Sequence, residues 1–372
     1  HRRPGRLAGA RLRQDKRLTM LHLNPNKLRD FIQQLFERVG SESKEAERIA
    51  FYLVQSNLTG HDSHGVIRAP YYIDYVKNDQ TRTNQSLSVI FQTDSMAIVD
   101  GNFGFGQVIG EQAMQLGIDM AKKHGIATVS LRNSAHLGRI GDWPTMVADA
   151  GMASFHFVNT SGYGLLVAPF GGIDRRLSAN PIAAGVPVEG KKPIILDIST
   201  CAIAEGKLKV ALNKGVEVEP GCIMDNAGNA ITDQAQFYTD PPGVLLPFGG
   251  HKGYGLSIIA EMFAGALTGN SCSNPANDQR LLNGMYSLII DCDRLPEELG
   301  FAAEVQRFID FVKSARKAPG FDEILMPGEI EEKNRKDREA NGIEIDDTTW
   351  QTLCDSAKDL GVDEAVVQES IL

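Results

Sequence analysis

The spacing of the hydrophobic residues changes along this chain of 372 residues, and that change limits the possible folds more than any other feature. Near the start, apolar residues recur at intervals of three and four, as on one face of a helix: Leu28, Phe31, Ile32, Leu35, Phe36 and Val39. We expect Asn26 to cap this helix and Gly40 to end it. Further helices are predicted over about 43–57 and 62–76.

From about residue 87 the hydrophobic residues instead form short β-branched runs separated by glycine and proline, which is typical of strands. The predicted strands are Leu87–Phe91, Ala97–Asp100, Ala127–Leu131, Met152–Val158, Ile194–Asp197 and Met285–Ile290. Two helices are predicted between them, over 107–124 and 253–266. Helical spacing returns after residue 300, where Asp347 is the expected cap of a helix that carries Trp350.

These patterns predict an α+β (α/β) protein in which helices from both chain ends pack together beside a central domain with a mixed sheet. The expected central domain covers residues 86–300, and the helical domain combines residues 21–85 with residues 301–372. Residues 1–19 open with histidine and show no apolar period. We therefore expect them to be a mis-assigned start or an expression remnant outside the fold.

The distribution of charge excludes several classes of partner. Residues 1–19 hold seven basic residues and one acidic residue, yet the whole chain has a net charge of -9, so the remainder is more acidic still. Such a body should repel nucleic acid and anionic membrane surfaces. No stretch approaches the roughly 20 apolar residues of a membrane helix. The five cysteines include no CxxC pair, which favours free thiols and a cytoplasmic protein over a disulfide framework.

One short segment, residues 61–68 (HDSHGVIR), concentrates groups that could do chemistry. If it enters a helix, His64 and Arg68 lie four residues apart and share a face. Reduction of a 2-oxo acid needs a proton donor beside the carbonyl oxygen and a cation for the carboxylate, and histidine and arginine can supply these. The simpler alternative, which the residues leave open, is a helix cap at Asp62 or Ser63 with no chemical role for the histidine.

Three glycine-containing segments could hold a ligand. Residues 132–141 (RNSAHLGRIG) follow a predicted strand, and residues 249–255 (GGHKGYG) precede a helix, whose N-terminus attracts anions. The turn over 101–110 is close to a dinucleotide fingerprint. Its third glycine comes one residue late, however, and no acidic residue follows the next strand, so a Rossmann site is a weak interpretation. An ordinary turn is the alternative for each segment taken alone.

Two other classes of function remain open at this point. His61 and His64 form an HxxH pair that, with Asp62 or His136, could bind a metal ion in a hydrolase or lyase, although no third ligand lies nearby in the sequence. A dimer that binds a cofactor without catalysing a reaction is the third class.

Taken together, the motifs resemble those of the type-2 malate/L-lactate dehydrogenase family, which is unrelated to the Rossmann lactate and malate enzymes. The matching segments are, in order, GHDSHGVIR (60–68), the GxFGxGQ turn (101–107), LRNSAHLGRIG (131–141), SANPIA (178–183), LDISTCAIAEGK (196–207), GGHKGYGLS (249–257) and a late PGE (327–329). The chain is most similar to the hydroxycarboxylate dehydrogenase branch, which reduces 2-oxo acids including aryl-pyruvates. The resemblance implies an NAD(P)-dependent oxidoreductase that interconverts a 2-hydroxy acid and its 2-oxo acid.

The resemblance also implies a non-Rossmann site for NAD, with NADP as the alternative, close to the interface of a homodimer. By position, His64 and His136 are the expected catalytic residues, and Ser63 and Arg68 the expected substrate-binding residues. The substrate is a small-molecule acid, and no metal ion is expected. The expected cofactor contacts are His64, Gly138, Arg139, Ile140, Ile195, Leu196, Asp197, Ile198, Ser199, His251, Lys252, Asn283, Gly328, Glu329, Ile330 and Glu331.

Overall fold

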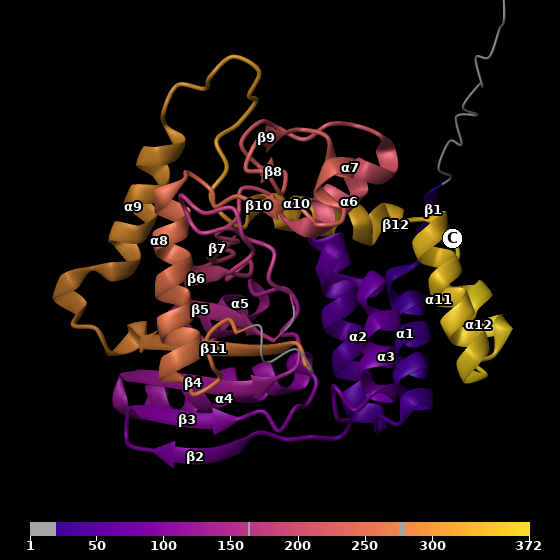
Figure 1. The fold of residues 1–372 in the computed structure, drawn as a ribbon. Helices are drawn as coiled ribbons and strands as arrows, with labels where there is room; N and C mark the ends of the chain where they lie inside the picture. Colours follow the sequence, from indigo (N-terminus) through magenta and orange to yellow (C-terminus); the bar gives the residue numbers. More distant parts are fainter. Residues whose placement is uncertain (1–19, 163, 275–279) are drawn as a thin grey trace, which may run out of the picture.

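The computed structural model describes residues 20–162, 164–274 and 280–372, so the expectation for residues 1–19 lies outside the described residues. Helices from both ends of the chain stand beside a central sheet that carries further helices (Figure 1). This mixed arrangement of helices and strands confirms the predicted fold class. None of the described helices combines the length and the apolarity that crossing a bilayer requires.

The two ends of the chain share one hydrophobic core. Buried residues of α1, α2, α3, α11 and α12 form this core, and β1 pairs antiparallel with β12 at its edge. The N-terminal elements are β1 (Met20–Leu23), α1 (Pro25–Val39), α2 (Ser43–Leu58), the 3-10 turns η1 (Asp62–His64) and η2 (Val66–Arg68), and α3 (Ala69–Lys77). The C-terminal elements are α10 (Glu329–Asn341), β12 (Ile343–Asp346), α11 (Asp347–Leu360) and α12 (Glu364–Glu369).

Helix α1 begins earlier than predicted. Asn24, not Asn26, is the cap: its side-chain oxygen accepts hydrogen bonds from the backbone N–H groups of Asn26 (3.0 Å) and Lys27 (3.1 Å). Pro25 explains the difference, because its fixed φ and missing N–H suit the first helical position. Gly40 ends the helix as predicted, with a left-handed φ of 114°.

Two other helix starts also differ from the prediction. Asp346, not Asp347, caps α11 by accepting a hydrogen bond from the backbone N–H of Thr349 at 3.0 Å. The helix predicted over 62–76 becomes two 3-10 turns followed by α3. Gly65 separates the turns because its extended backbone (φ -83°, ψ -153°) cannot continue a helix.

The central sheet has seven strands within the described residues, in the order β2-β3-β4-β11-β5-β6-β7. Strands β3 and β4 run parallel and the other neighbours antiparallel, so the sheet is mixed, as predicted. The sequence of β6, IAAGV, gave little strand signal because alanine and glycine are not β-branched. The strands are β2 (Ser88–Gln92), β3 (Met96–Asp100), β4 (Ile126–Ser134), β5 (Met152–Ser161), β6 (Ile182–Val186), β7 (Ile194–Ile198) and β11 (Leu282–Asp291).

Helices cover both faces of this sheet. Side chains alternate between faces along a strand. Val158 and Met285 therefore join the core beneath α4 and α5, whereas Phe157 and Tyr286 contact Phe263 on the opposite face. The helix predicted over 253–266 is α8 continued by a π-helical segment. The bounds are α4 (Gly106–His124), α5 (Asp142–Asp149), α8 (His251–Ala260) and the π-helix η3 (Glu261–Leu267).

A third hydrophobic core lies around a small three-stranded sheet, with strand order β10-β8-β9. Helix α9 adds no buried residue to the core that the chain ends share. The domain boundaries at residues 85/86 and 300/301 stay a prediction. The remaining elements are α6 (Glu205–Lys214), β8 (Ile223–Met224), β9 (Ala230–Ile231), α7 (Gln234–Phe237), β10 (Val244–Leu245), η4 (Cys292–Arg294), η5 (Glu297–Leu299) and α9 (Phe301–Lys313).

One buried histidine in the sheet makes stability depend on pH. His156 lies on β5, and the hydroxyls of Ser287 and Ser154 each contact one of its ring nitrogens at 2.8 Å. Burial lowers the pKa of His156 from 6.5 to about 3. The folded protein therefore keeps this ring neutral, while the unfolded chain takes up a proton as the pH falls below the ordinary histidine pKa.

Above pH 7, neutral His156 makes its full contribution to the free energy of unfolding. This contribution is lost as the pH falls towards 3. We expect a change from pH 7 to pH 5 to lower the free energy of unfolding by about 2 kcal/mol through this residue alone. Urea unfolding of the wild type and of His156→Gln at both pH values measures this difference, since glutamine does not titrate. Equal pH dependence in the two proteins would show that the buried imidazole makes no such contribution.

Candidate active site

The HDSHG segment is held in two tight turns by side chains from distant elements. Asn57, at the end of α2, accepts a hydrogen bond from the backbone N–H of Val66 (2.9 Å) and donates one to Asp62 (2.7 Å). Arg338 of α10 donates to both carboxylate oxygens of Asp62, at 2.6 and 3.1 Å. A Cβ on Gly65 would overlap the Asn57 side-chain oxygen, so only glycine fits there. Asp62 therefore fixes the turn and is not free to act as a base.

The structure brings His64 and His136 together, although 72 positions separate them in the sequence. Their rings are stacked, with centroids 5.6 Å apart and planes inclined by 17°. His64 lies on η1 and His136 in the loop that follows β4, and both side chains are only partly exposed. The Ser63 hydroxyl lies 3.0 Å from Nδ1 of His64. Neither Nε2 atom has a hydrogen-bond partner in the part of the chain that the structure describes.

Burial and positive charge keep both imidazoles neutral. Burial lowers the pKa of His64 well below its ordinary value, and the nearby His136 and Arg68 lower it further. Burial, assisted by the charge of Arg68, lowers the pKa of His136 to about 3. A neutral imidazole can accept a proton from a hydroxyl group or donate a hydrogen bond from its single N–H.

Arg68 supplies a cation beside the two rings. Its Nε donates a hydrogen bond to the Ser63 carbonyl at 2.7 Å, which fixes the direction of the guanidinium. Among residues 20–162, 164–274 and 280–372, no carboxylate forms an ion pair with it. The two terminal nitrogens are therefore available for a planar anion, and a carboxylate matches that geometry.

Two charged side chains tie the predicted cofactor loops together. Arg139 is buried, donates to Asp142 at 2.9 Å and lies 3.8 Å from Asp197. Asp197 also accepts a hydrogen bond from the backbone N–H of Gly141 at 2.8 Å. The charged ends of Arg139 and Asp197 thus hold the loop after β4, which carries Gly138 and Ile140, against β7.

The residues around Gly328 reach the same place from the C-terminal part of the chain. The backbone N–H of Ile195 donates to the Pro327 carbonyl at 3.0 Å, and a Cβ on Gly328 would come within 3.3 Å of that nitrogen. In the first turn of α10, one carboxylate oxygen of Glu331 lies 3.3 Å from Nε2 of His61. This hydrogen bond holds the pKa of Glu331 below its ordinary value.

The second carboxylate oxygen of Glu331 is buried and has no partner among the described residues. A buried acceptor of this kind is costly unless something donates a hydrogen bond to it. A ligand hydroxyl would satisfy it, so the junction of β7, the loop after β4 and α10 has the polar character of a ligand site.

The remaining predicted contacts lie on α10, on β7 or just after it, and at the start of α8. His251 and Lys252 are exposed at the start of α8, which lies next to the end of β7 because the N–H of Phe248 donates to the Thr200 carbonyl at 3.0 Å. Ile330 is exposed and lies on the same turn of α10 as Glu331. The others are Leu196, Ile198 and Ser199, on or just after β7, and Glu329, whose carboxylate pairs with Lys313.

Asn283 on β11 is buried and positions the loop that carries His136. Its side-chain oxygen accepts from the backbone N–H of Leu137 at 2.9 Å. Its amide nitrogen donates to the Asn159 carbonyl and the Thr160 hydroxyl, both at 3.0 Å. The polar ends of Asn283 are thus occupied by the protein, and this residue acts on a ligand through the loop that it holds.

Several residues that build the site were not predicted from the sequence. Tyr72 of α3 contacts His136, and Gln107 of α4 contacts Tyr72. Gln107 ends the GxFGxGQ motif, which provided a signal, whereas Tyr72 lies in an ordinary helical pattern. Asn57 and Arg338 also look like surface residues of their helices in the sequence. Only the fold brings Asn57 and Arg338 to the two turns and places Tyr72 and Gln107 beside His136.

The SANPIA motif has a structural role. Asn180 is fully buried and donates to the Glu261 carboxylate at 2.8 Å. Glu261, at the start of the π-helix, also accepts from the side chain of Asn159 at 3.1 Å and from the backbone N–H of Ser273 at 2.9 Å. This network joins the π-helix to β5 and to the segment before β6.

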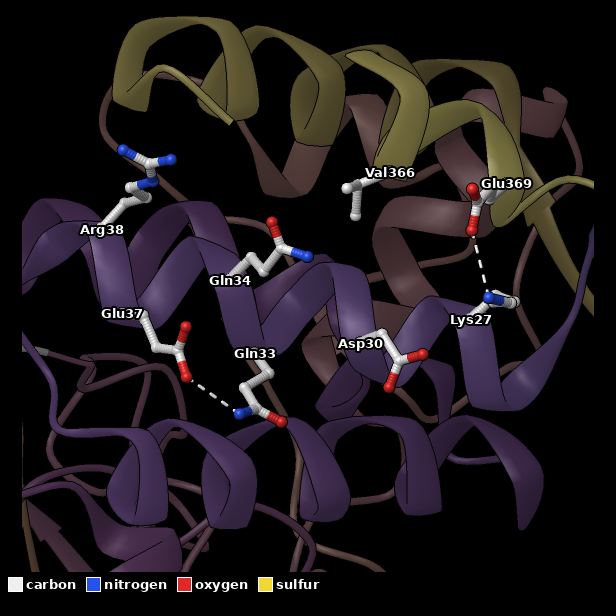
Figure 2. Close-up of a pocket in the computed structure, with 8 residues that line it drawn as sticks. All are labelled: Lys27, Asp30, Gln33, Gln34, Glu37, Arg38, Val366 and Glu369. Carbon is white, nitrogen blue, oxygen red and sulfur yellow. Dashed lines mark hydrogen bonds and ion pairs between the residues drawn. The ribbon is translucent and has the colours of Figure 1, made fainter. Parts of the chain in front are cut away.

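A surface groove of about 500 Å³ lies elsewhere, between α1 and α12 (Figure 2). The hydrogen bonds drawn in it are surface contacts, from Lys27 to Glu369 (3.1 Å) and from Gln33 to Glu37 (2.9 Å). None of the predicted site residues lines it. Its lining residues are Lys27, Asp30, Gln33, Gln34, Glu37, Arg38, Val366 and Glu369.

The groups of the metal-site alternative point to different partners. His61 contacts Glu331, Asp62 is held by Arg338, and Nδ1 of His64 faces Ser63. Within the described residues, no group of three or more histidine, cysteine, aspartate or glutamate side chains could hold a metal ion.

Comparison with known proteins relates the chain to a family of dehydrogenases. The sequence model of the malate/L-lactate dehydrogenase family matches residues 23–354. Hydroxycarboxylate dehydrogenase B of Escherichia coli (strain K12) is 39% identical over 350 residues, which cover 92% of this chain and 95% of that protein. The L-lactate dehydrogenase of Cupriavidus necator is 35% identical over 323 residues, covering 85% and 91%. A solved structure from E. coli, described as a malate/lactate dehydrogenase, has a TM-score of 0.89, 38% identity and coverage of 93% and 97%.

Proposed function

Because the chain belongs to the malate/L-lactate dehydrogenase family, a family of nicotinamide-dependent oxidoreductases, we propose that it interconverts a 2-hydroxy acid and its 2-oxo acid at the paired histidines. The observation that carries this assignment is the stacking of His64 and His136 beside Arg68, a cation with no acidic partner in the described chain. Relatives named as hydroxycarboxylate and lactate dehydrogenases act on acids of this class.

The residues at the junction fit a nicotinamide dinucleotide. Glu331 offers a buried acceptor for a hydroxyl group, and Gly328, three residues before it, allows a close approach to β7, because a Cβ there would lie 3.3 Å from the Ile195 nitrogen. The bound cofactor would supply the redox chemistry, by accepting a hydride from carbon 2 of the hydroxy acid or returning it to the 2-oxo acid. The free carboxylate oxygen favours NAD over NADP, since a ribose hydroxyl can donate to it and a phosphate cannot.

The chain's own residues orient the acid and move the proton. Arg68 binds the substrate carboxylate through its two terminal nitrogens. Neutral His64 accepts the hydroxyl proton as carbon 2 loses its hydride, and the protonated ring returns that proton in the opposite direction. Substrate binding assists the protonated form, because the carboxylate neutralises Arg68, one of the charges that lower the pKa of His64.

A screen of reduced cofactors against a panel of 2-oxo acids tests this function. We expect oxidation of NADH, faster than that of NADPH, with at least one acid of the panel, and no effect of a chelator. Activity that is lost when a chelator is added and that does not depend on NADH would favour the metal-dependent hydrolase or lyase. A change in NADH fluorescence without oxidation of the cofactor would favour a non-catalytic binding protein.

We infer that the enzyme acts as a homodimer. Helix α8 and the π-helix present an exposed apolar stripe at intervals of three to five residues, formed by Leu256, Ile259, Met262 and Leu267. Exposed apolar stripes of this kind mark protein interfaces. The stripe begins beside His251 and Lys252, so a second copy seated on it would lie next to the predicted cofactor contacts.

An acidic substitution in the stripe is expected to separate the dimer. Ile259→Glu places a charge at the centre of the proposed interface, and burial of an unpaired carboxylate costs several kcal/mol. We expect the wild type to be a dimer and this variant a monomer in light scattering coupled to size exclusion. Val216→Glu, at another exposed apolar residue outside the stripe, is the control and should stay dimeric. If the Ile259→Glu protein is still a dimer, the dimer interface lies elsewhere on the molecule.

The five cysteines are free thiols in the structure. Free thiols persist in reducing compartments, which supports a location in the cytoplasm.

A further inference from the structure

The second histidine of the site is held by a phenol that the reaction described above does not use. The Tyr72 hydroxyl lies 2.6 Å from Nδ1 of His136, and Nε2 of Gln107 donates to the same hydroxyl at 3.2 Å. Tyr72 is on α3 and Gln107 in the first turn of α4, and both are buried. Three elements therefore meet in one chain of hydrogen bonds that ends at the imidazole.

The direction of these hydrogen bonds follows from which atoms can donate and which can accept. A phenol has one hydrogen to donate, and its oxygen already accepts the hydrogen of the Gln107 amide. Among the described residues, Nδ1 of His136 is the other atom within hydrogen-bond distance of this oxygen, so the buried phenol hydrogen has that nitrogen as its acceptor, and the Tyr72 hydroxyl donates to it. A neutral imidazole that accepts at Nδ1 carries its hydrogen at Nε2.

The electrostatics keep every member of the chain in this state. Burial raises the pKa of Tyr72 to about 12, so the phenol keeps its proton. Burial and Arg68 lower the pKa of His136, so the ring stays neutral. The groups that face His136 are His64 and Arg68 of the two turns, Tyr72 of α3 and Gln107 of α4.

We propose that Tyr72, oriented by Gln107, is a positioning residue that fixes His136 in its Nε2–H tautomer. His136 then serves as a hydrogen-bond donor to the substrate oxygen, and His64 alone carries the proton. These separate roles of His64 and His136 rest on the proposed function, because they are roles within that reaction. They also account for the GxFGxGQ motif, which ends in Gln107. Gly106 of this motif packs so closely that a Cβ would overlap the His136 carbonyl oxygen.

The tautomer can be measured without turnover. In ¹⁵N spectra of the histidine side chains, we expect Nδ1 of His136 to be unprotonated and Nε2 protonated in the wild type. Tyr72→Phe removes the donor and should give a mixture of the two tautomers, whereas Tyr71→Phe, at an exposed residue of the same helix, should leave the spectrum unchanged. A wild-type ring protonated at Nδ1 would overturn the proposal.

Kinetics then test the consequence for the reaction. Loss of a fixed donor should lower kcat of Tyr72→Phe by about 10- to 100-fold, with little change in KM, because the hydrogen bond strengthens as charge develops on the oxygen. Tyr71→Phe should keep the wild-type kcat. An unchanged kcat for Tyr72→Phe would overturn the proposal, as would a loss confined to KM.

A variant that reverses the direction of these hydrogen bonds gives the most direct test. In Gln107→Glu, an ionised carboxylate can only accept, so the Tyr72 hydroxyl must turn towards it and Nδ1 of His136 must take the hydrogen. We expect kcat to lie about 10- to 100-fold below the wild-type value at alkaline pH, where the buried carboxyl group is ionised, and to recover as the pH is lowered, since this group can donate again once it is protonated. A pH profile equal to that of the wild type would contradict the mechanism.

Failure of this proposal differs from failure of the proposed function. If the wild type oxidises no reduced nicotinamide with any 2-oxo acid, the function is wrong, while the ¹⁵N spectrum still reports the tautomer. If the wild type is active and Tyr72→Phe matches it in both kcat and spectrum, the function stands and the role of Tyr72 is wrong.

Discussion

The His64→Gln enzyme is expected to turn over at least about 100-fold more slowly than the wild type, the usual contribution of general acid–base catalysis. Glutamine has a similar size and can still contact the Ser63 hydroxyl, so the turn should persist, but it cannot exchange a proton. The loss should appear in kcat in both directions of the reaction, with the KM values for acid and cofactor nearly unchanged. Steady-state kinetics with the best acid of the screen provide the measurement.

His136→Gln is the informative comparison for this variant. A glutamine amide can donate a hydrogen bond, and the inferred role of His136 is donation, so this variant should lose less turnover than His64→Gln. Normal turnover of His64→Gln would remove His64 from the proton transfer, and a much larger loss in His136→Gln would exchange the two roles. His61→Gln tests selectivity, because His61 contacts Glu331 and should influence cofactor binding more than turnover.

The sequence predicted the regular elements well where their own spacing is diagnostic. The one-face stripe of α1 and the β-branched runs of β3, β4 and β11 are local properties, and local patterns survive tertiary packing. The helix starts at Asn24 and Asp346 were each misplaced because several neighbouring residues could cap and only the folded backbone selects one.

The site was less accessible from local patterns than the fold. Taken alone, His64 could equally be an incidental histidine at a helix cap, and His136 an incidental histidine in a loop. The order of seven motifs, through the family resemblance, assigned both residues to one site. Side chains that act through another residue carried no such signal. Tyr72 occupies an apolar position of α3, and its hydroxyl contacts His136 and Gln107 only because the fold places the loop after β4 and α4 beside it.

Arg139 and Asp197 show why motif membership does not fix a role. Both lie in segments that the resemblance assigns to the cofactor, yet their charged groups bind each other and neighbouring loops. A charge buried in such a network stabilises the geometry of the site, and removing one partner leaves the other uncompensated. The same family motif can thus preserve a scaffold or a contact, and the folded arrangement of the side chains decides between the two.

Substitution of Arg68 by lysine should raise KM for the 2-oxo acid by about 10-fold or more, since loss of one hydrogen bond to a charged group costs at least about 1.5 kcal/mol. The guanidinium uses Nε to hold the Ser63 carbonyl at 2.7 Å and keeps two parallel nitrogens for the carboxylate. A lysine ammonium has the same charge but cannot do both. Initial rates over a range of acid concentrations at saturating NADH give the KM.

A methyl ester of the same 2-oxo acid isolates the contact in question. The ester lacks the anionic carboxylate, so the wild type should handle it poorly, and Arg68→Lys should reduce its kcat/KM much less than that of the acid. The KM for NADH should stay near the wild-type value in both enzymes, because Arg68 lies beside the histidines and not among the loops joined by Asp197 and Glu331. If the acid KM is unchanged, or if acid and ester lose equally, another cation binds the carboxylate and Arg68 only supports the turn through Ser63.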